Sequence, residues 1–165
     1  MKKEEQVTGE NKINLIVDID LLGLGYVYPK ARTGVFRVTE ELLTSFLSHS
    51  GLEVHFSAQS NLSDAIAYLE KASLMQNAKF VHSKAELSKA ASLNQLRAIC
   101  FGNKFLERVF RKVRRYFFQQ TAGFSELPTN PVYFSTYNEL PKAIQDNKSI
   151  KKVILIHDLI SVRLP

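Results

Sequence analysis

The chain has 165 residues and is 45% apolar, enough to bury one ordinary hydrophobic core and without sign of a second. Its single cysteine, Cys100, excludes an internal disulfide framework and a thiolate metal cluster, as is typical of a reducing compartment. No apolar run approaches the roughly 18 residues that a membrane span needs, so we expect one domain of a cytoplasmic protein.

The formal net charge of +6 is concentrated in one segment. Between positions 104 and 115 the sequence has six positive residues and one negative residue, Glu107. An electrostatic partner is therefore expected to bind there. The first dozen residues carry charges of both signs and no apolar core, so we interpret 1–12 as a flexible tail that is neither a signal peptide nor a packed element.

The predicted elements begin with a buried strand. The stretch "INLIVDID", residues 13–20, is β-rich and apolar and turns acidic at its end. A long loop with three glycines, "LLGLGYVYPKARTG", is expected to follow. The next stretch, "VFRVTEELLTSFLSHSG", has apolar residues at helical spacing, with Val35, Val38, Leu42 and Phe46 on the core face.

Strands and helices continue to alternate along the chain. "LEVHFSA" predicts a strand, "NLSDAIAYLEKASL" a helix and "AKFVHS" a third strand. A helical pattern then covers about 84–120, and further strands are expected at 132–135 and 153–156. This order predicts an α/β fold: a single Rossmann-like domain over 13–165, with a mostly parallel sheet and helices on both faces.

Such a sheet binds ligands outside the carboxyl ends of its strands, where the strand order reverses. Residues 18–34, the stretch "FSTYNELP" and the pair His157-Asp158 are expected to converge there. The Gly23-Leu24-Gly25 sequence does not predict a dinucleotide site, because Tyr28 takes the place of the third glycine and the helix is expected to begin only at about Val35.

Asp18 and Asp20 are two residues apart, which places both carboxylates on one side of a strand end, where they could bind a divalent cation. The pair is similar to the opening motif of haloacid-dehalogenase-type phosphohydrolases, whose first Asp is the nucleophile and whose second is the acid/base. Leu22 stands where that family has Thr or Val, and no strand-end acidic pair follows. A structural role, with one carboxylate capping the loop and one solvated, is therefore favoured, and phosphohydrolase activity is kept as an alternative.

Gly34 lies where the predicted loop becomes a helix. Backbone N–H groups and the helix dipole at such a position could face an anion such as a diphosphate. Arg37, in the first turn, could add a charged fork to the same ligand. The alternative is a turn glycine beside a solvated arginine, and spacing leaves both interpretations open.

His157 ends a predicted buried strand. Its imidazole could hydrogen-bond a sugar or phosphate oxygen or carry a proton, although a lone histidine at a strand end is more often structural. Asp158 is most simply the cap of the following turn. A metal-dependent His-Asp phosphohydrolase would need the pair on a helix with further His and Asp ligands, so this pair does not predict an enzyme of that kind.

The stretch "KFLERVFRKVRRYFF" forms an amphipathic basic helix in this interpretation. It is either a helix packed in the core with a positive outer face or a helix that lies on anionic lipid. The two alternatives are compatible if only the basic face touches the lipid headgroups. Nucleic acid is not expected, because no stacking motif accompanies the charge. The basic face consists of Arg108, Arg111, Lys112, Arg114 and Arg115.

The order of "TGVFRVTEELL", "VYFSTYNELP" and "KKVILIHDLISVRLP" resembles the N-terminal domain of retaining, two-domain (GT-B type) glycosyltransferases of the group-1, or family 4, class. In many of these enzymes Gly-Ile/Val-Gly-Arg opens the first helix, and a strand ending in His-Asp-Leu, with a nearby Pro, follows downstream. The resemblance covers most of 13–165 and is weakest between 61 and 129.

By this resemblance, Gly34 corresponds to the loop glycine near the donor diphosphate and Arg37 to the arginine of the motif. His157 corresponds to the histidine that lines the sugar pocket, with Asp158 as its neighbour, and these two are the candidate catalytic residues. Phe36 departs from the second glycine of the motif. The resemblance implies a nucleotide-sugar as donor substrate, no other cofactor and no metal.

The implied function is transfer of a sugar, with retention, to a glycan or lipid-linked acceptor in polysaccharide or cell-envelope biosynthesis. The family holds its donor mainly in a C-terminal Rossmann-like domain with paired glutamates, which this sequence does not contain. We therefore expect a fragment or half-enzyme, inactive alone, that works with such a domain or partner chain. Peripheral contact with the inner face of the membrane is expected of residues 104–117, and a non-catalytic module that binds anionic surfaces through them is the second alternative.

Overall fold

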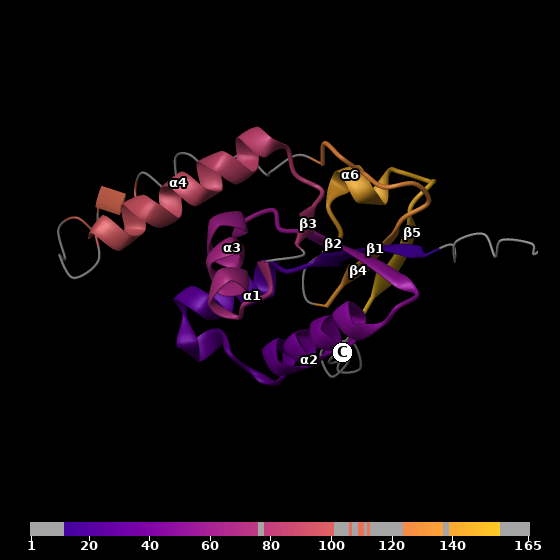
Figure 1. Ribbon diagram of the computed structural model, residues 1–165, viewed down its shortest axis with the longest axis horizontal. Helices are drawn as coiled ribbons and strands as arrows, with labels where there is room; N and C mark the ends of the chain where they lie inside the picture. The colour runs from indigo at the N-terminus through magenta and orange to yellow at the C-terminus, as the bar shows by residue number, and fades with distance from the viewer. Residues whose placement is uncertain are drawn as a thin grey trace, which may run out of the picture.

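The computed structural model describes residues 12–75, 78–100, 106, 109–110, 112, 124–136 and 139–155 (Figure 1). The first half contains β1 (Ile13–Asp18), α1 (Asp20–Val27), the 3-10 turn η1 (Pro29–Ala31), α2 (Gly34–Ser48), β2 (Leu52–Ser57) and α3 (Leu62–Lys71). The second half contains β3 (Lys79–Phe80), α4 (Lys84–Cys100), β4 (Val132–Ser135), α6 (Lys142–Gln145) and β5 (Lys151–Ile154).

The five described strands form one parallel sheet in the order β3-β2-β1-β4-β5. The first three strands along the chain lead from the centre of the sheet to one edge, because β2 pairs with β1 and β3 pairs with β2. The next strand, β4, pairs with the other side of β1. The strand order therefore reverses between β1 and β4, which is the arrangement of doubly wound α/β sheets. The predicted Rossmann-like α/β fold is confirmed.

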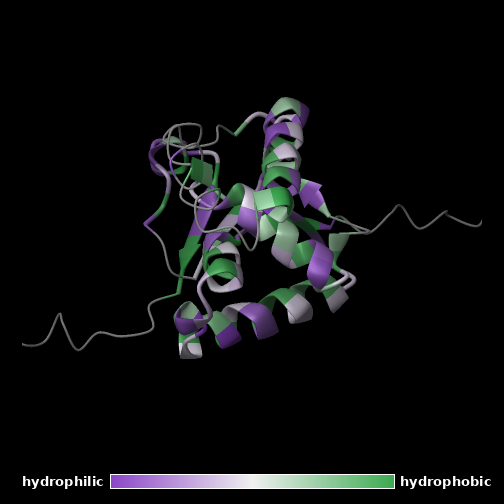
Figure 2. Ribbon diagram, turned by 90° about the vertical axis from the view of Figure 1, so that its left-hand side faces the viewer, coloured by the Kyte–Doolittle hydropathy of each residue, from purple (hydrophilic) through white to green (hydrophobic). Residues whose placement is uncertain are grey.

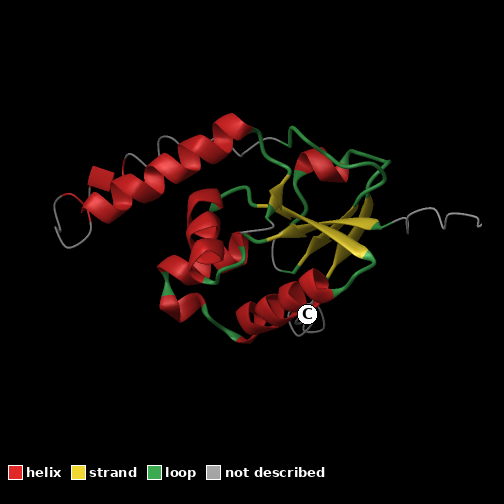
Figure 3. Cartoon of the chain, viewed as in Figure 1, coloured by secondary structure: helices red, strands yellow, loops and turns green. Residues whose placement is uncertain are grey.

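Helices cover both faces of this sheet, as predicted. On one face, Leu15 and Val17 of β1 pack with Leu43 of α2 in the larger apolar cluster, which α1, α3 and α4 also join. On the other face, Ile16 packs with Tyr133 of β4 and Ile144 of α6 in a smaller cluster. Figures 1 and 3 show α2 and α6 on opposite sides of the strands. Because alternate side chains of β1 point to opposite faces of the sheet, β1 contributes residues to both apolar clusters.

Helix α1 was predicted as a loop, and that prediction is wrong. A Cβ atom on Gly23 would lie 2.7 Å from the backbone nitrogen of Ala65, and one on Gly25 would lie 2.3 Å from the Phe36 ring. The glycines therefore allow α1 to approach α3 and α2 closely. Glycine lowers helix propensity by about 1 kcal/mol, and close tertiary packing offsets that cost here.

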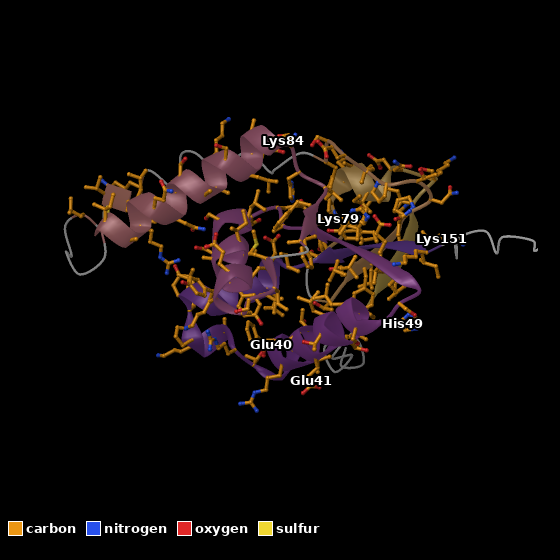
Figure 4. All side chains as sticks on the ribbon, in the orientation of Figure 1. Glu40, Glu41, His49, Lys79, Lys84 and Lys151 are labelled. Atoms are coloured by element: carbon orange, nitrogen blue, oxygen red, sulfur yellow. The ribbon has the colours of Figure 1, made fainter. Side chains whose placement is uncertain are left out.

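The predicted core face of helix α2 is confirmed in part, because Val35 and Phe46 pack against the larger apolar cluster. Its buried residues are Phe36, Thr39 and Leu43, whereas Val38, predicted on the core face, is 37% exposed. Its contact with α3 includes a 2.5 Å hydrogen bond from the Tyr68 hydroxyl to Glu40. Figure 4 shows Glu40 and Glu41 on α2, and Glu41 is exposed.

Helix α4 extends away from the sheet and contacts α3 (Figures 1 and 3). The Arg97 guanidinium lies 3.0 Å from an Asp64 oxygen and 5.3 Å from the centre of the Tyr26 ring. Figure 2 shows apolar and polar residues intermixed along this helix. Within the described ranges, no helix combines the length and apolar character that crossing a membrane requires.

Helix α4 accounts for the first part of the helix predicted over 84–120, and beyond it the four described residues 106, 109, 110 and 112 are also helical. The last predicted strand, 153–156, is found as β5, which begins at Lys151 and ends at Ile154. All four β5 residues are exposed, so the prediction of a buried strand here is wrong.

Candidate functional site

Three buried polar side chains end the three central strands, Ser57 in β2, Asp18 in β1 and Ser135 in β4, and a fourth, Tyr133, is the second residue of β4. Asp18 of β1 is opposite Ser57 of β2, and Ser135 of β4 follows Phe134, which is opposite Val17. Strand alternation places Ser57, Asp18 and Ser135 on the face that carries Tyr133. We call Ser57, Asp18, Ser135 and Tyr133 the polar row, and none of them is more than 4% exposed. The row spans the point where the strand order reverses.

Asp18 and Asp20 have different local contacts. An Asp18 oxygen, Oδ1, accepts the backbone N–H of Asp20 at 2.9 Å. The Asp20 carboxylate accepts the backbone N–H groups of Gln59, Ser60 and Asn61 at 2.8 to 3.2 Å. Asp20 thus fixes the connection between β2 and α3. The expectation that one carboxylate is solvated is wrong, because Asp18 and Asp20 are 4% and 3% exposed.

Tyr133 supplies a neutral hydroxyl to the row. Its Oη lies 3.4 Å from the Ser57 hydroxyl oxygen. Burial, and then the negative charge of Asp18, raise the pKa of Tyr133 above its ordinary value. Tyr133 therefore keeps its proton at physiological pH and remains available as a hydrogen-bond donor. Among the described residues, no three His, Cys, Asp or Glu side chains are grouped so that they could hold a metal ion.

Helix α2 begins at Gly34, as the sequence predicted to within one residue. Its N-cap, Thr33, makes no side-chain capping hydrogen bond, and its first turn has no acidic residue. Gly34 and Arg37 are both exposed, and a Cβ atom on Gly34 would meet nothing within 4 Å. The positive end of the helix dipole therefore lies at an exposed residue, one turn before an exposed arginine.

A buried hydrogen bond ties this helix to the carboxyl end of β4. The hydroxyls of Thr39 and Thr136 are 2.8 Å apart, and Thr39 also donates to the Val35 carbonyl at 2.9 Å. Both threonines are at most 2% exposed. Thr136 immediately follows Ser135, so the first turns of α2 lie near the carboxyl end of β4, on the sheet face opposite the polar row. The sequence analysis missed both residues, and a threonine within the apolar stripe of a helix was the available signal.

His82 is a second residue that the sequence analysis missed. It follows β3, and its Nε2 accepts the Ala58 backbone N–H at 3.0 Å, so that nitrogen carries no proton. Its ring stacks on Phe124, with 6.1 Å between ring centres, and Phe124 also packs edge-on against Tyr133. The signal was a histidine directly after the short strand "AKFV".

Several predicted site residues are not placed. His157, Asp158, Arg108, Arg111, Arg114 and Arg115 lie outside the described residues, and Lys112 is exposed. At the end of β5, the Leu155 N–H donates to the Ser135 carbonyl at 2.9 Å, so the described chain reaches the edge that carries the polar row.

No family model matches the chain, and neither does any curated protein or solved structure.

Proposed function

We propose that this domain is the acceptor-side, N-terminal domain of a retaining GT-B type glycosyltransferase. The observation that supports it best is the hydrogen bond between Thr39 and Thr136. Thr39 belongs to "TGVFRVTEELL" and Thr136 to "VYFSTYNELP", and these are two of the three stretches that carry the resemblance. They meet across 97 residues of chain at the edge where doubly wound sheets bind ligands.

The start of α2 supplies a positive site for the diphosphate of a nucleotide-sugar. Its first backbone N–H groups and the Arg37 guanidinium would bind the phosphate oxygens. Phe36, which departs from the family motif, is 2% exposed, and its ring packs against Tyr68. Its side chain therefore belongs to the core and leaves the exposed start of the helix open. A C-terminal Rossmann-like domain or partner chain would hold the rest of the donor.

The test uses the polypeptide encoded by the complete reading frame. It is incubated with radiolabelled nucleotide-sugars and with glycan and lipid-linked acceptors, and transfer is measured by chromatography. Arg37→Ala is expected to lower transfer about tenfold or more, because a hydrogen bond to a charged group contributes about 1.5–3 kcal/mol. Lys71→Ala, at the end of α3, is the control and should transfer normally. The proposal fails if no donor is used or if Arg37→Ala transfers at the unsubstituted rate.

A second proposed function, peripheral attachment to an anionic membrane face, is favoured by the exposure of four apolar side chains. Leu96 and Ile99 of α4 are 47% and 75% exposed, and Leu106 and Val109 are 38% and 43% exposed. They flank or lie within the basic segment 104–115. Apolar side chains that enter the headgroup region, with cations nearby, are what such attachment requires.

Vesicle co-sedimentation tests this attachment. The chain should sediment with vesicles that contain phosphatidylserine and much less with phosphatidylcholine alone. Ile99→Asp and the triple reversal Arg111→Glu, Arg114→Glu, Arg115→Glu should each weaken binding, whereas Leu127→Asp, at an apolar residue exposed elsewhere, should not. Equal binding to both vesicle types, or to neither, would exclude this function.

A further inference from the structure

We infer that the outer edge of β5 binds an extended acidic segment of a partner protein, which adds to the sheet as an antiparallel strand. β5 is an edge strand, because its only pairing among the described strands is with β4. Doubly wound sheets often carry an antiparallel strand at such an edge. This docking site uses other residues than the proposed function does, and it does not depend on that function.

Two residues of β5 present backbone groups at the outer edge. In a parallel ladder, alternate residues direct both their N–H and their C=O groups to the same neighbouring strand. The N–H groups of Lys151 and Leu155 donate to carbonyls just before and at the end of β4, at 3.1 and 2.9 Å. Lys152 and Ile154 therefore direct theirs outward, where the described part of the chain offers no strand. Such an edge is a template for an added strand.

Both faces of β5 are exposed beside this edge, and each has one lysine followed by one apolar residue. Lys151 and Val153 lie on the face that α2 covers, because Val153 is opposite Phe134, which packs against the larger cluster. Lys152 and Ile154 lie on the other face. Val153 and Ile154 are 44% and 50% exposed. An added strand would thus cover apolar side chains at the carboxyl end of β5 and meet lysines at its amino end.

The charge around β5 favours an acidic partner. The described stretch 139–155 has four lysines and two carboxylates, and β5 itself has two lysines and no acidic residue. None of these lysines forms an ion pair with another described residue. Acidic side chains opposite Lys151 and Lys152 would form cross-strand pairs of opposite charge. The net charge of +6 would also attract an acidic partner from a distance.

The lysines of β5 argue against two other occupants of the edge. A second copy of β5 would bring four lysines onto two adjacent strands, where like charges destabilise the pairing. The terminal segments of this chain have no net charge to complement the lysines. Residues 1–12 have three lysines and three glutamates, and residues 156–165 have one aspartate and one arginine. A separate acidic segment therefore fits this edge best.

The probe is the acetylated and amidated peptide Thr-Val-Ile-Glu-Glu-Thr, and NMR titration of the full chain measures its binding. In antiparallel register its Val and Ile lie opposite Ile154 and Val153. Its glutamates lie opposite Lys152 and Lys151. We expect saturable binding that weakens as the salt concentration rises from about 0.01 to about 1 M. The Lys152 and Ile154 amide protons should exchange with solvent about tenfold more slowly, or less, once the peptide is bound.

N-methylated peptides separate backbone pairing from side-chain contact. Methyl groups on the nitrogens of Val and the first Glu remove the donors that face Ile154 and Lys152, so this peptide should not bind. Methyl groups on the nitrogens of Ile and the second Glu point away from β5, so this matched peptide should bind normally. Equal binding of the two methylated peptides would show that no strand is added.

Variants of β5 test the charge and the edge separately. Lys151→Glu with Lys152→Glu should weaken binding about tenfold or more, because two attractions become repulsions. Lys84→Glu with Lys89→Glu on α4 makes the same change of charge elsewhere and should bind normally; Figure 4 shows Lys84 well apart from Lys151. Ile154→Pro removes an outward N–H without removing a bond to β4, so it should abolish binding and keep the fold, as judged by circular dichroism.

The proposal is overturned if the peptide does not bind, or if the β5 double reversal binds it as the unsubstituted chain does. Slow exchange of the Lys152 and Ile154 amides without peptide would also overturn it. In a monomeric chain, slow exchange would mean that another segment of the same chain occupies the edge. In a dimer, identified by sedimentation, it would mean that a second copy does. If Ile154→Pro does not fold, the methylated peptides still decide whether a strand is added.

Discussion

Asp20 at the start of α1 holds the start of α3 through Asn61, whose backbone N–H donates to Asp20 Oδ1 at 2.8 Å. The Gln59 and Ser60 N–H groups bind the same carboxylate. One side chain therefore joins the first crossover of the sheet to the second.

Asp20→Ala should lower the free energy of unfolding by about 2–4 kcal/mol, because it leaves three partly buried backbone N–H groups without their acceptor. Urea unfolding followed by circular dichroism measures this loss. Asp20→Asn, which keeps one acceptor oxygen, should lose less, and Asp146→Ala should lose almost nothing. A loss below about 0.5 kcal/mol for Asp20→Ala, the size of an ordinary surface change, would contradict the role given to this carboxylate.

Gly23 and Gly34 should respond in opposite ways to alanine. A Cβ atom on Gly23 would lie 2.7 Å from a backbone nitrogen of α3, which cannot move cheaply, so Gly23→Ala should cost about 1–3 kcal/mol. Gly34→Ala should change stability by no more than about 0.5 kcal/mol, since the added methyl meets open space. Thermal melting compares the two variants, and equal effects would disprove the close packing of α1 on α3.

Thr39 and Thr136 should be energetically coupled. Thr39→Val keeps the side-chain shape but removes a hydroxyl, and Thr136 then loses its buried partner, at an expected cost of about 1–2 kcal/mol. A double-mutant cycle with Thr136→Val should give a coupling energy of about 0.5–3 kcal/mol. Thr39→Ser preserves the hydroxyl and should stay close to the unsubstituted protein. Strict additivity of the two valine variants would show that the bond contributes nothing to stability.

His55 should make the fold less stable in mild acid. Burial, as the main cause, lowers the pKa of His55 from its ordinary 6.5, and its Nε2 lies 3.7 Å from a Glu53 oxygen. In the pH range below 6.5 and above the lowered value, the unfolded chain binds the proton more readily than the folded chain does. The stability that neutral His55 gives the fold is thus fully present above pH 6.5. It is lost as the pH falls from 6.5 toward the lowered pKa of the folded state.

Unfolding midpoints at pH 7.5 and 5.5 test this assignment. His55→Gln should show a smaller loss of stability between the two values than the unsubstituted chain does. His49→Gln, at an exposed residue, is the control and should show the full loss. A larger loss of stability between these pH values in His55→Gln than in the unsubstituted chain would show that His55 does not destabilise the fold in acid.

The strands and their order along the chain could be predicted because buried runs such as "NLIVD" and "VYFS" are separated by helical patterns. Helix α1 could not, since Gly23 and Gly25 argue against a helix until the backbone of α3 is known to approach them. The helical spacing of α2 and part of its core face were recognised, but the burial of Thr39 was missed because its polar partner lies far away in sequence.

Residues of the candidate site could be predicted only where the sequence pattern of a single segment was enough to place them. Asp18 and Asp20 were recognised at a strand end, and Gly34 at the start of a helix. The alignment of Ser57, Asp18 and Ser135 depends on the parallel register of three strands. Neither the register nor the strand order follows from the periodicity of any one segment.

The pairing of β1 with β4 also has a consequence for how the protein is made. This pair joins the two halves of the sheet, and the Asn14 side chain donates to the Thr129 carbonyl across 115 residues. Contacts of such sequence separation form slowly, after local ones. On the ribosome, β1, α2 and β2 can associate early, while the outer half of the sheet must await synthesis of β4. The edge formed by the carboxyl ends of the central strands is therefore completed late, and nascent chains stalled before residue 132 should lack it.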